Sequence, residues 1–215
     1  MAFVYIILGI IVVFVALTFW KKYTRSKDII TVENPKILIA SLEGDQEDLQ
    51  LAKEDQNIYS STFKKIDNKI IDNTDELLSL AESSFYDVIH LIVNVEEGKL
   101  RDKNNNSIEL RDLIIKAQNG KTTYVLLAKG NDHTNYMEGM EGESFAVNLV
   151  MTVDRKGKDF ITFFKSLFEK INSGKPMPIA WHELAPQIPN ANHEHVPGTL
   201  CAMGAGNVIL REIDS

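Results

Sequence analysis

Short, nearly continuous apolar runs recur along the chain from residue 36 onward and predict buried β-strands. The clearest run is YDVIHLIVNV at residues 86–95, which is rich in β-branched side chains and is followed by Glu96, Glu97 and Gly98. Such a run is typical of a strand that is covered on both faces. Similar runs predict strands at residues 36–42, 122–128 and 146–153, a weaker strand at 65–72, and short strands at 199–202 and 206–211.

Between these runs, apolar residues recur every three or four positions and predict amphipathic helices. Such spacing is found at residues 46–64, 109–118 and 160–171. Asn73 is followed three positions later by Glu76, a capping-box signature that predicts a further helix start. Residues 98–108 have the pattern of a hairpin. Strands alternating with helices predict an α/β domain with a mostly parallel sheet flanked by helices.

The pattern at the N-terminus differs from that of the rest of the chain. Residues 2–20 read AFVYIILGIIVVFVALTFW and carry no charge. A helix of this length would rise about 28 Å, close to the roughly 30 Å hydrocarbon core of a bilayer. The run therefore predicts one transmembrane helix at residues 2–20. A cleaved signal peptide is the alternative, but the run is long and bulky Phe19 and Trp20 stand where small residues would be expected.

The charge distribution refines this prediction. Four basic residues and one acid fall within residues 1–28, so this part carries +3 of the net charge of −7, and the remainder carries −10. Basic residues immediately after a span favour a cytoplasmic C-terminal side. We therefore expect a basic linker at residues 21–35 and a cytoplasmic domain at residues 36–215. Its acidic balance argues against a nucleic-acid partner, and the single cysteine excludes a disulfide framework.

Two stretches of the domain resemble a known family. TDELLSLAESSFYDVIHLIVNV, followed by the predicted hairpin and helix and then by TTYVLLAKGND, is similar to the CHAT branch of the caspase-like cysteine peptidases. In that family the first stretch ends in H-x-x-x-H-G and the second in A-C. The order of elements is similar over about residues 36–173. The resemblance implies a caspase-like fold, and the apolar run at residues 2–20 places the predicted transmembrane helix before it.

The same alignment implies that the catalytic residues of the family are replaced. His90 falls on the family's first, non-catalytic histidine, Asn94 on its catalytic histidine and Lys129 on its catalytic cysteine. Peptide hydrolysis on this fold needs a thiolate and an imidazole. An amide cannot act as the base. The resemblance thus argues for the fold and against the activity. Because function in open α/β sheets lies beyond the carboxyl ends of the strands, we expect a binding edge around His90, Asn94, Lys129 and Asp154.

A second set of residues offers a weaker alternative. Cys201 is the only thiol, and His193 and His195 precede it by eight and six residues. A Cys/His pair formed there would make a relocated nucleophile, although a buried strand cysteine is the commoner role. The alternate histidines lack a third spaced ligand, so no metal site is predicted. The chain has no Walker or G-x-G-x-x-G pattern, and no cofactor is predicted.

The working hypothesis is a membrane-anchored, non-catalytic domain that acts by binding a protein partner. One alternative is an active hydrolase that uses Cys201 or Ser144 as its nucleophile. Another is an α/β signalling domain that senses a nucleotide. The sequence carries no phosphate-binding loop in support of the last of these.

Overall fold

A computed structural model of the chain describes residues 29–42, 46–93, 95–128, 149–153, 160–184 and 207–213. For residues 128 and 149–153 it describes the backbone only. The strands are β1 (Ile30–Glu33), β2 (Lys36–Ser41), β3 (Lys65–Ile70), β4 (Val88–Ile92), β5 (Val95–Glu96), β6 (Lys99–Arg101), β7 (Ser107–Glu109), β8 (Tyr124–Ala128), β9 (Leu149–Val153) and β10 (Val208–Arg211). The helices are α2 (Gln46–Tyr59), α3 (Thr74–Glu82), α4 (Leu110–Asn119), α6 (Phe160–Asn172) and α7 (Met177–Leu184).

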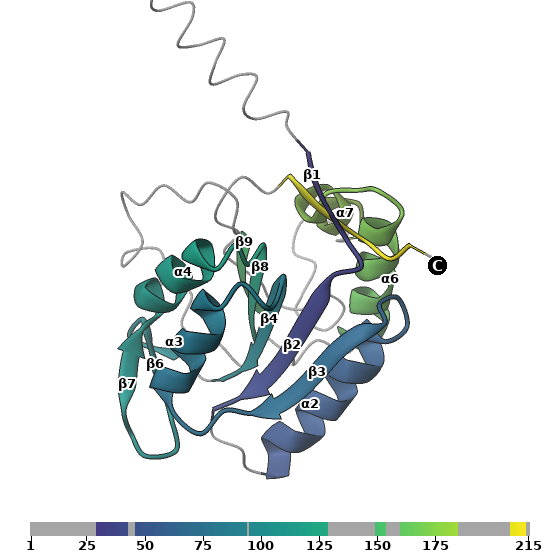
Figure 1. Ribbon diagram of the computed structural model, residues 1–215. Helices are drawn as coiled ribbons and strands as arrows, with labels where there is room; N and C mark the ends of the chain where they lie inside the picture. The colour runs from purple at the N-terminus through teal and green to yellow at the C-terminus, as the bar shows by residue number, and fades with distance from the viewer. Residues whose placement is uncertain are drawn as a thin grey trace, which may run out of the picture.

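A five-stranded sheet forms the centre of the domain, in the order β3-β2-β4-β8-β9, and all of its pairings are parallel (Figure 1). β2 and β4 are apolar and buried along nearly their whole length, as expected for strands covered on both faces. The predicted α/β class with a parallel sheet is therefore confirmed. The strands predicted at residues 36–42, 65–72, 86–95, 122–128 and 146–153 all form, with shorter bounds.

Helices cover both faces of this sheet (Figure 1). One core contains α2, α6 and α7 packed on β2, β4 and β8, and the aromatic side chains of α6 lie within it. The other core contains α3 and α4 on the opposite face. The apolar stripe predicted along residues 160–171 is thus a core stripe: Phe163, Phe164, Leu167 and Phe168 are all buried.

Local sequence signals explain where several helices begin and end. The Asn73 side chain accepts a hydrogen bond of 2.9 Å from the backbone N–H of Glu76, which confirms the predicted cap of α3. The Glu76 carboxylate in turn accepts from the backbone N–H of Asp72. α4 is followed by Gly120, whose backbone packs against the end of α3. A Cβ at this position would overlap the carbonyl oxygen of Ala81.

Two small sheets accompany the central one. β5, β6 and β7 form the predicted hairpin region. β1 pairs in parallel with β10, close to the C-terminus of the chain. β1 lies in the segment expected to be a linker, and only its pairing with a distant strand makes it regular. The Tyr124 hydroxyl donates a hydrogen bond of 2.6 Å to the carbonyl oxygen of Val208 and so joins β8 to β10.

An ion-pair cluster fixes α7 beside α6. The Glu183 carboxylate accepts hydrogen bonds from Lys170 at 2.8 Å and from Lys175 at 2.6 Å. These hydrogen bonds lower the pKa of Glu183 to about 2.

The membrane prediction requires correction. Among the residues that the structure describes, no helix is long and apolar enough to cross a bilayer. The longest described helix is α2, whose 14 residues would rise only about 21 Å and include several charges. This finding contradicts the fold prediction of a preceding transmembrane helix and the single-pass membrane localisation. The predicted span itself, residues 2–20, lies outside the described residues.

Candidate functional site

The five strands of the central sheet end at one level. Ser41 pairs in register with Ile70 on one side and Ile92 on the other, Ile92 pairs with Ala128, and Ala128 with Val153. The strand order places a topological switch point between β2 and β4, because the chain turns to opposite sides from these two strands. Ligand sites in open parallel sheets form beyond the carboxyl ends of the strands at such a point. Polar groups at this edge and around it are therefore the candidates for a functional site.

His90 lies in the middle of β4, below this edge, and points into the core between the sheet and α2. It is 3% exposed. Its Nδ1 lies 2.9 Å from the Tyr59 hydroxyl and its Nε2 lies 3.1 Å from a carboxylate oxygen of Asp55. The edge of the imidazole also meets the Tyr59 ring, with a centroid separation of 5.5 Å. Both ring nitrogens are thus next to polar atoms of α2.

The chemistry of these three groups is mutually consistent. Burial, reinforced by the nearby Asp55 carboxylate, raises the pKa of Tyr59 well above its usual value, so the phenol stays protonated. A protonated phenol can donate to Nδ1 of a neutral imidazole, which then carries its proton on Nε2, toward Asp55. Tyr59 also stacks on Phe168 of α6, with ring centroids 4.4 Å apart. The group therefore joins α2, β4 and α6 inside the core.

A second buried polar pair lies nearer the carboxyl edge. The Ser41 hydroxyl, on the last residue of β2, donates a hydrogen bond of 2.7 Å to a carboxylate oxygen of Asp48. Both residues are buried, and Asp48 is in the first turn of α2, where a negative charge interacts favourably with the helix dipole. This pair fixes the start of α2 against the switch point.

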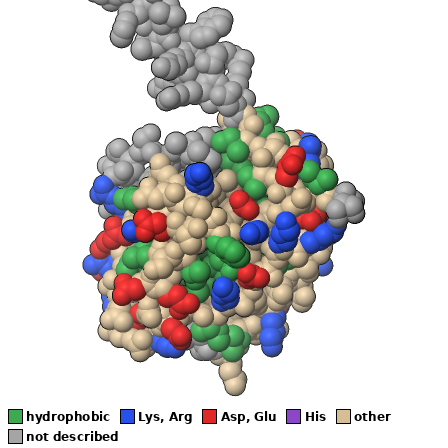
Figure 2. Space-filling view, in the orientation of Figure 1, with side chains coloured by type: hydrophobic (Ala, Val, Ile, Leu, Met, Phe, Trp, Pro, Cys, Tyr) green, Lys and Arg blue, Asp and Glu red, His purple; other side chains and the backbone are tan. Residues whose placement is uncertain are grey.

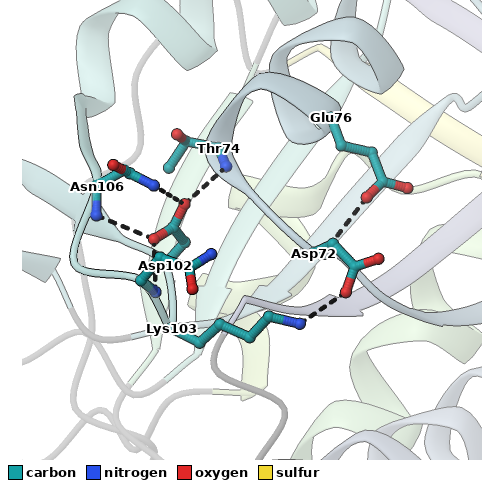
Figure 3. A network of polar contacts seen from close by, with 7 residues as sticks. Asp72, Thr74, Glu76, Asp102, Lys103 and Asn106 are labelled. Atoms are coloured by element: carbon teal, nitrogen blue, oxygen red, sulfur yellow. Dashed lines mark hydrogen bonds and ion pairs between the residues drawn. The ribbon is translucent and has the colours of Figure 1, made fainter.

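A third polar network surrounds Asp102 in the β6–β7 loop (Figure 3). Its carboxylate accepts hydrogen bonds from the backbone N–H groups of Asn104, Asn106 and Thr74, and from the Asn106 side chain. Loss of solvation raises the pKa of Asp102, but these hydrogen bonds outweigh it and hold the pKa below its usual value. The carboxylate already accepts several hydrogen bonds from the hairpin and from α3. Its role is therefore to fix the hairpin to the start of α3.

The structure describes only one of the predicted site residues. That residue is His90, and it is a core residue rather than part of an open edge. The others lie outside the described residues: Asn94, Lys129, Asp154, His193, His195 and Cys201. In sequence, however, Asn94, Lys129 and Asp154 come one or two residues after the register level at which β4, β8 and β9 end. Within the described part of the chain, no group of three His, Cys, Asp or Glu side chains is placed to hold a metal ion.

Sequence reasoning missed the acidic partners of the core. Asp48, Ala52, Asp55 and Tyr59 follow one another at spacings of three or four residues and are all buried on one face of α2. The signal was present, because two aspartates share the stripe of Ala52 and Tyr59. It would have indicated that buried polar partners, here Ser41 and His90, lie on the strands beneath.

Comparisons with known proteins give a limited result. No protein-family model and no curated protein matches the chain. Among solved structures, the chain is similar to pro-sf-caspase-1, with a TM-score of 0.49 and 10% sequence identity over 86% of this chain and 92% of that one. At this TM-score the similarity does not establish a fold family, and it does not show the CHAT branch. It carries no information on activity, substrate or site residues.

Proposed function

We propose that this chain is a non-catalytic domain that binds a protein partner at the carboxyl edge of its parallel sheet. The proposed contact surface is formed by Asn94, Lys129 and Asp154, which come one or two residues after the ends of β4, β8 and β9. The register of these strands supports the proposal, because the three strands end side by side and the chain leaves all of them at one edge of the sheet. Ligands bind at this edge in open parallel sheets.

The observation that carries the non-catalytic part is the enclosure of His90. This is the only histidine in the caspase-like stretch from β4 to β8, and its imidazole is 3% exposed with both nitrogens beside Tyr59 and Asp55. A general base must come within hydrogen-bond reach of the substrate proton. An imidazole held inside the core beneath α2 cannot do so without separation of that helix from the sheet.

The resemblance found in the sequence supports the same conclusion. The positions of the family's catalytic histidine and cysteine correspond to Asn94 and Lys129. Neither an amide nor an ordinary lysine supplies a thiolate nucleophile with its base. An amide and an ammonium group at a sheet edge are instead suited to hydrogen bonds and ion pairs with a protein partner that carries acidic side chains.

Two measurements on the full chain test the proposal. The first is hydrolysis of a general protein substrate such as casein, compared with the Cys201→Ala variant, for which we expect no cleavage by either. The second places a photo-crosslinking amino acid at position 129, and as a control at position 104 in the exposed hairpin loop. We expect one defined protein to be captured in cells from position 129 and lost when Asp154 or Asn94 is replaced by lysine.

Two outcomes would overturn the proposal. Cleavage that disappears in Cys201→Ala would show an active thiol hydrolase. Equal capture of the same proteins from positions 129 and 104 would show that the carboxyl edge is not a specific contact surface.

A further inference from the structure

One side edge of the central sheet presents an open strand. β3 is the outermost strand of the central sheet (Figure 1), and among the described residues it pairs with β2 alone. Five of its six residues are exposed, among them the apolar Ile70, which is 48% exposed. An unpaired edge with such a residue is a template for another strand. Its sequence, Lys-Ile-Asp-Asn-Lys-Ile, carries none of the prolines that would block pairing.

The pairing with β2 determines which backbone groups of β3 point outward. The N–H of Ile71 donates to the carbonyl of Ser41 in β2. Because the N–H and C=O groups of successive strand residues point to alternate sides, the odd-numbered residues of β3 bond to β2. The backbone groups of Ile66, Asn68 and Ile70 therefore face the open edge. An antiparallel partner strand must bond to these three residues.

Two antiparallel two-fold registers let a second β3 strand pair five residues with this edge. In an antiparallel pair, two residues directly opposite each other have their backbone N–H and C=O groups either both toward the partner strand or both away from it. In a two-fold pair the axis must therefore pass through a residue and not between two residues. An axis at Asp67 would place Asp67 opposite Asp67 and Lys65 opposite Lys69. Like charges directly opposite each other are destabilising.

An axis at Asn68 gives the opposite result. It places Asp67 opposite Lys69 of the second copy, and Lys69 opposite Asp67, so two unlike pairs form. It also places Ile66 opposite Ile70 in both directions, which covers the exposed Ile70, and Asn68 opposite Asn68. The pairs at residues 66, 68 and 70 are the hydrogen-bonded ones, whereas Asp67 and Lys69 form the closer, non-hydrogen-bonded pairs in which side chains interact more strongly.

The side chains that would form these pairs are already oriented by the fold. Tyr86 donates a hydrogen bond of 2.7 Å to the Asp67 carboxylate, and the Lys69 ammonium lies 5.6 Å from the centroid of the Tyr86 ring. A carboxylate has acceptor capacity left after this one bond. On the other face of the strand, the Asn68 amide lies beside Gln56 of α2. The side of the molecule drawn in Figure 2 carries both charge signs, with hydrophobic side chains between them.

We propose that β3 is a homodimerisation edge, at which a second copy of this chain adds its own β3 antiparallel, with the two-fold axis at Asn68, to form one continuous sheet. The occupant is a second copy because the strand complements its own charges in this register. The proposal is independent of the partner-binding edge proposed above, which lies at the carboxyl ends of the strands.

A charge-exchange experiment on the full chain tests the register. Asp67→Lys places lysine opposite lysine, and Lys69→Asp places aspartate opposite aspartate, so we expect neither variant to form dimers. The double variant Asp67→Lys/Lys69→Asp restores unlike pairs and should dimerise as the original chain does. An equal mixture of the two single variants should form a heterodimer, since every charged pair is then unlike. The matched control is Lys99→Asp, a half-exposed strand lysine in the hairpin sheet.

Crosslinking provides the readout. In a Cys201→Ser background, Asn68→Cys places the two thiol-bearing residues directly opposite each other, with Cα atoms about 5.5 Å apart. A short bis-maleimide linker should join them, on the order of a thousandfold faster than it joins Ser107→Cys on exposed β7, because dimerisation raises the effective concentration from micromolar to millimolar. Two tags of different length distinguish heterodimers from homodimers on a gel.

The outcomes separate clearly. Fast crosslinking at position 68, its loss in both single charge variants and its return in their mixture are the expected set. Equal crosslinking at positions 68 and 107 would overturn the proposal, and so would dimers that survive in both single variants. If another protein's strand covers this edge, position 68 would not crosslink to a second copy, which also overturns it.

Discussion

Removal of the Tyr59 hydroxyl tests the core network most directly. Tyr59→Phe keeps the ring, its stacking on Phe168 and its edge contact with His90, so the substitution leaves no cavity. It removes one atom that lies 2.9 Å from Nδ1 of His90. The imidazole nitrogen is then left without that partner in a site where Tyr59 is 1% and His90 3% exposed.

The expected cost follows from this burial. A buried polar group that loses its partner costs about 1–3 kcal/mol, because it forfeits its hydrogen bond and cannot regain one from water. We therefore expect Tyr59→Phe to lower the free energy of unfolding by about 1–3 kcal/mol. The matched control is Tyr86→Phe, which removes the same atom from a hydrogen bond to the exposed Asp67. Water can replace that bond, so we expect a loss below about 1 kcal/mol.

Urea unfolding of the full chain, followed by near-ultraviolet circular dichroism, measures both values. A double-mutant cycle with His90→Leu then isolates the coupling: once the imidazole is gone, Tyr59→Phe should cost little more. The reasoning is refuted if Tyr59→Phe and Tyr86→Phe cost the same, or if the cost of Tyr59→Phe is unchanged in the His90→Leu background.

Three further predictions concern other contacts. Gly120→Ala should destabilise the domain by about 1–3 kcal/mol in a thermal melt, because the new Cβ overlaps the Ala81 carbonyl and forces α3 and α4 apart, whereas Ala at the exposed Ser83 should not. Tyr124→Phe should lose about 1 kcal/mol and speed hydrogen exchange in β10 more than in β4, because the bond to Val208 is lost. Because the pKa of Glu183 is lowered, its ion pairs stabilise the fold above pH 4.5 and cease to do so as the pH falls to about 2. The difference in stability between the original chain and Glu183→Gln should therefore vanish over this range.

The elements that the sequence predicted well share one property: their signals are local. The apolar run of β4, the Asn73 cap of α3 and the aromatic stripe of α6 each need only neighbouring residues, and each appears in the structure near its predicted bounds. β1 had no such signal. Its four residues are mostly exposed, and they form a strand because β10, nearly 180 positions later, pairs with them.

The candidate site was harder to predict because a polar residue can be a buried structural partner or an exposed binding group, and the two look alike in sequence. The sequence predicts His90 at an open binding edge, yet its imidazole is enclosed by α2. Whether His90 is enclosed or open depends on Asp55 and Tyr59, which are more than thirty positions away in the sequence. Their helical spacing turns both toward β4, but it can be recognised only if acidic residues are counted as part of the buried stripe. A buried charge needs a partner, and a buried histidine with both nitrogens close to such partners has little capacity left for a ligand. The same consideration locates recognition away from the centre of β4, at the ends of the strands and along the outward-facing β3 edge.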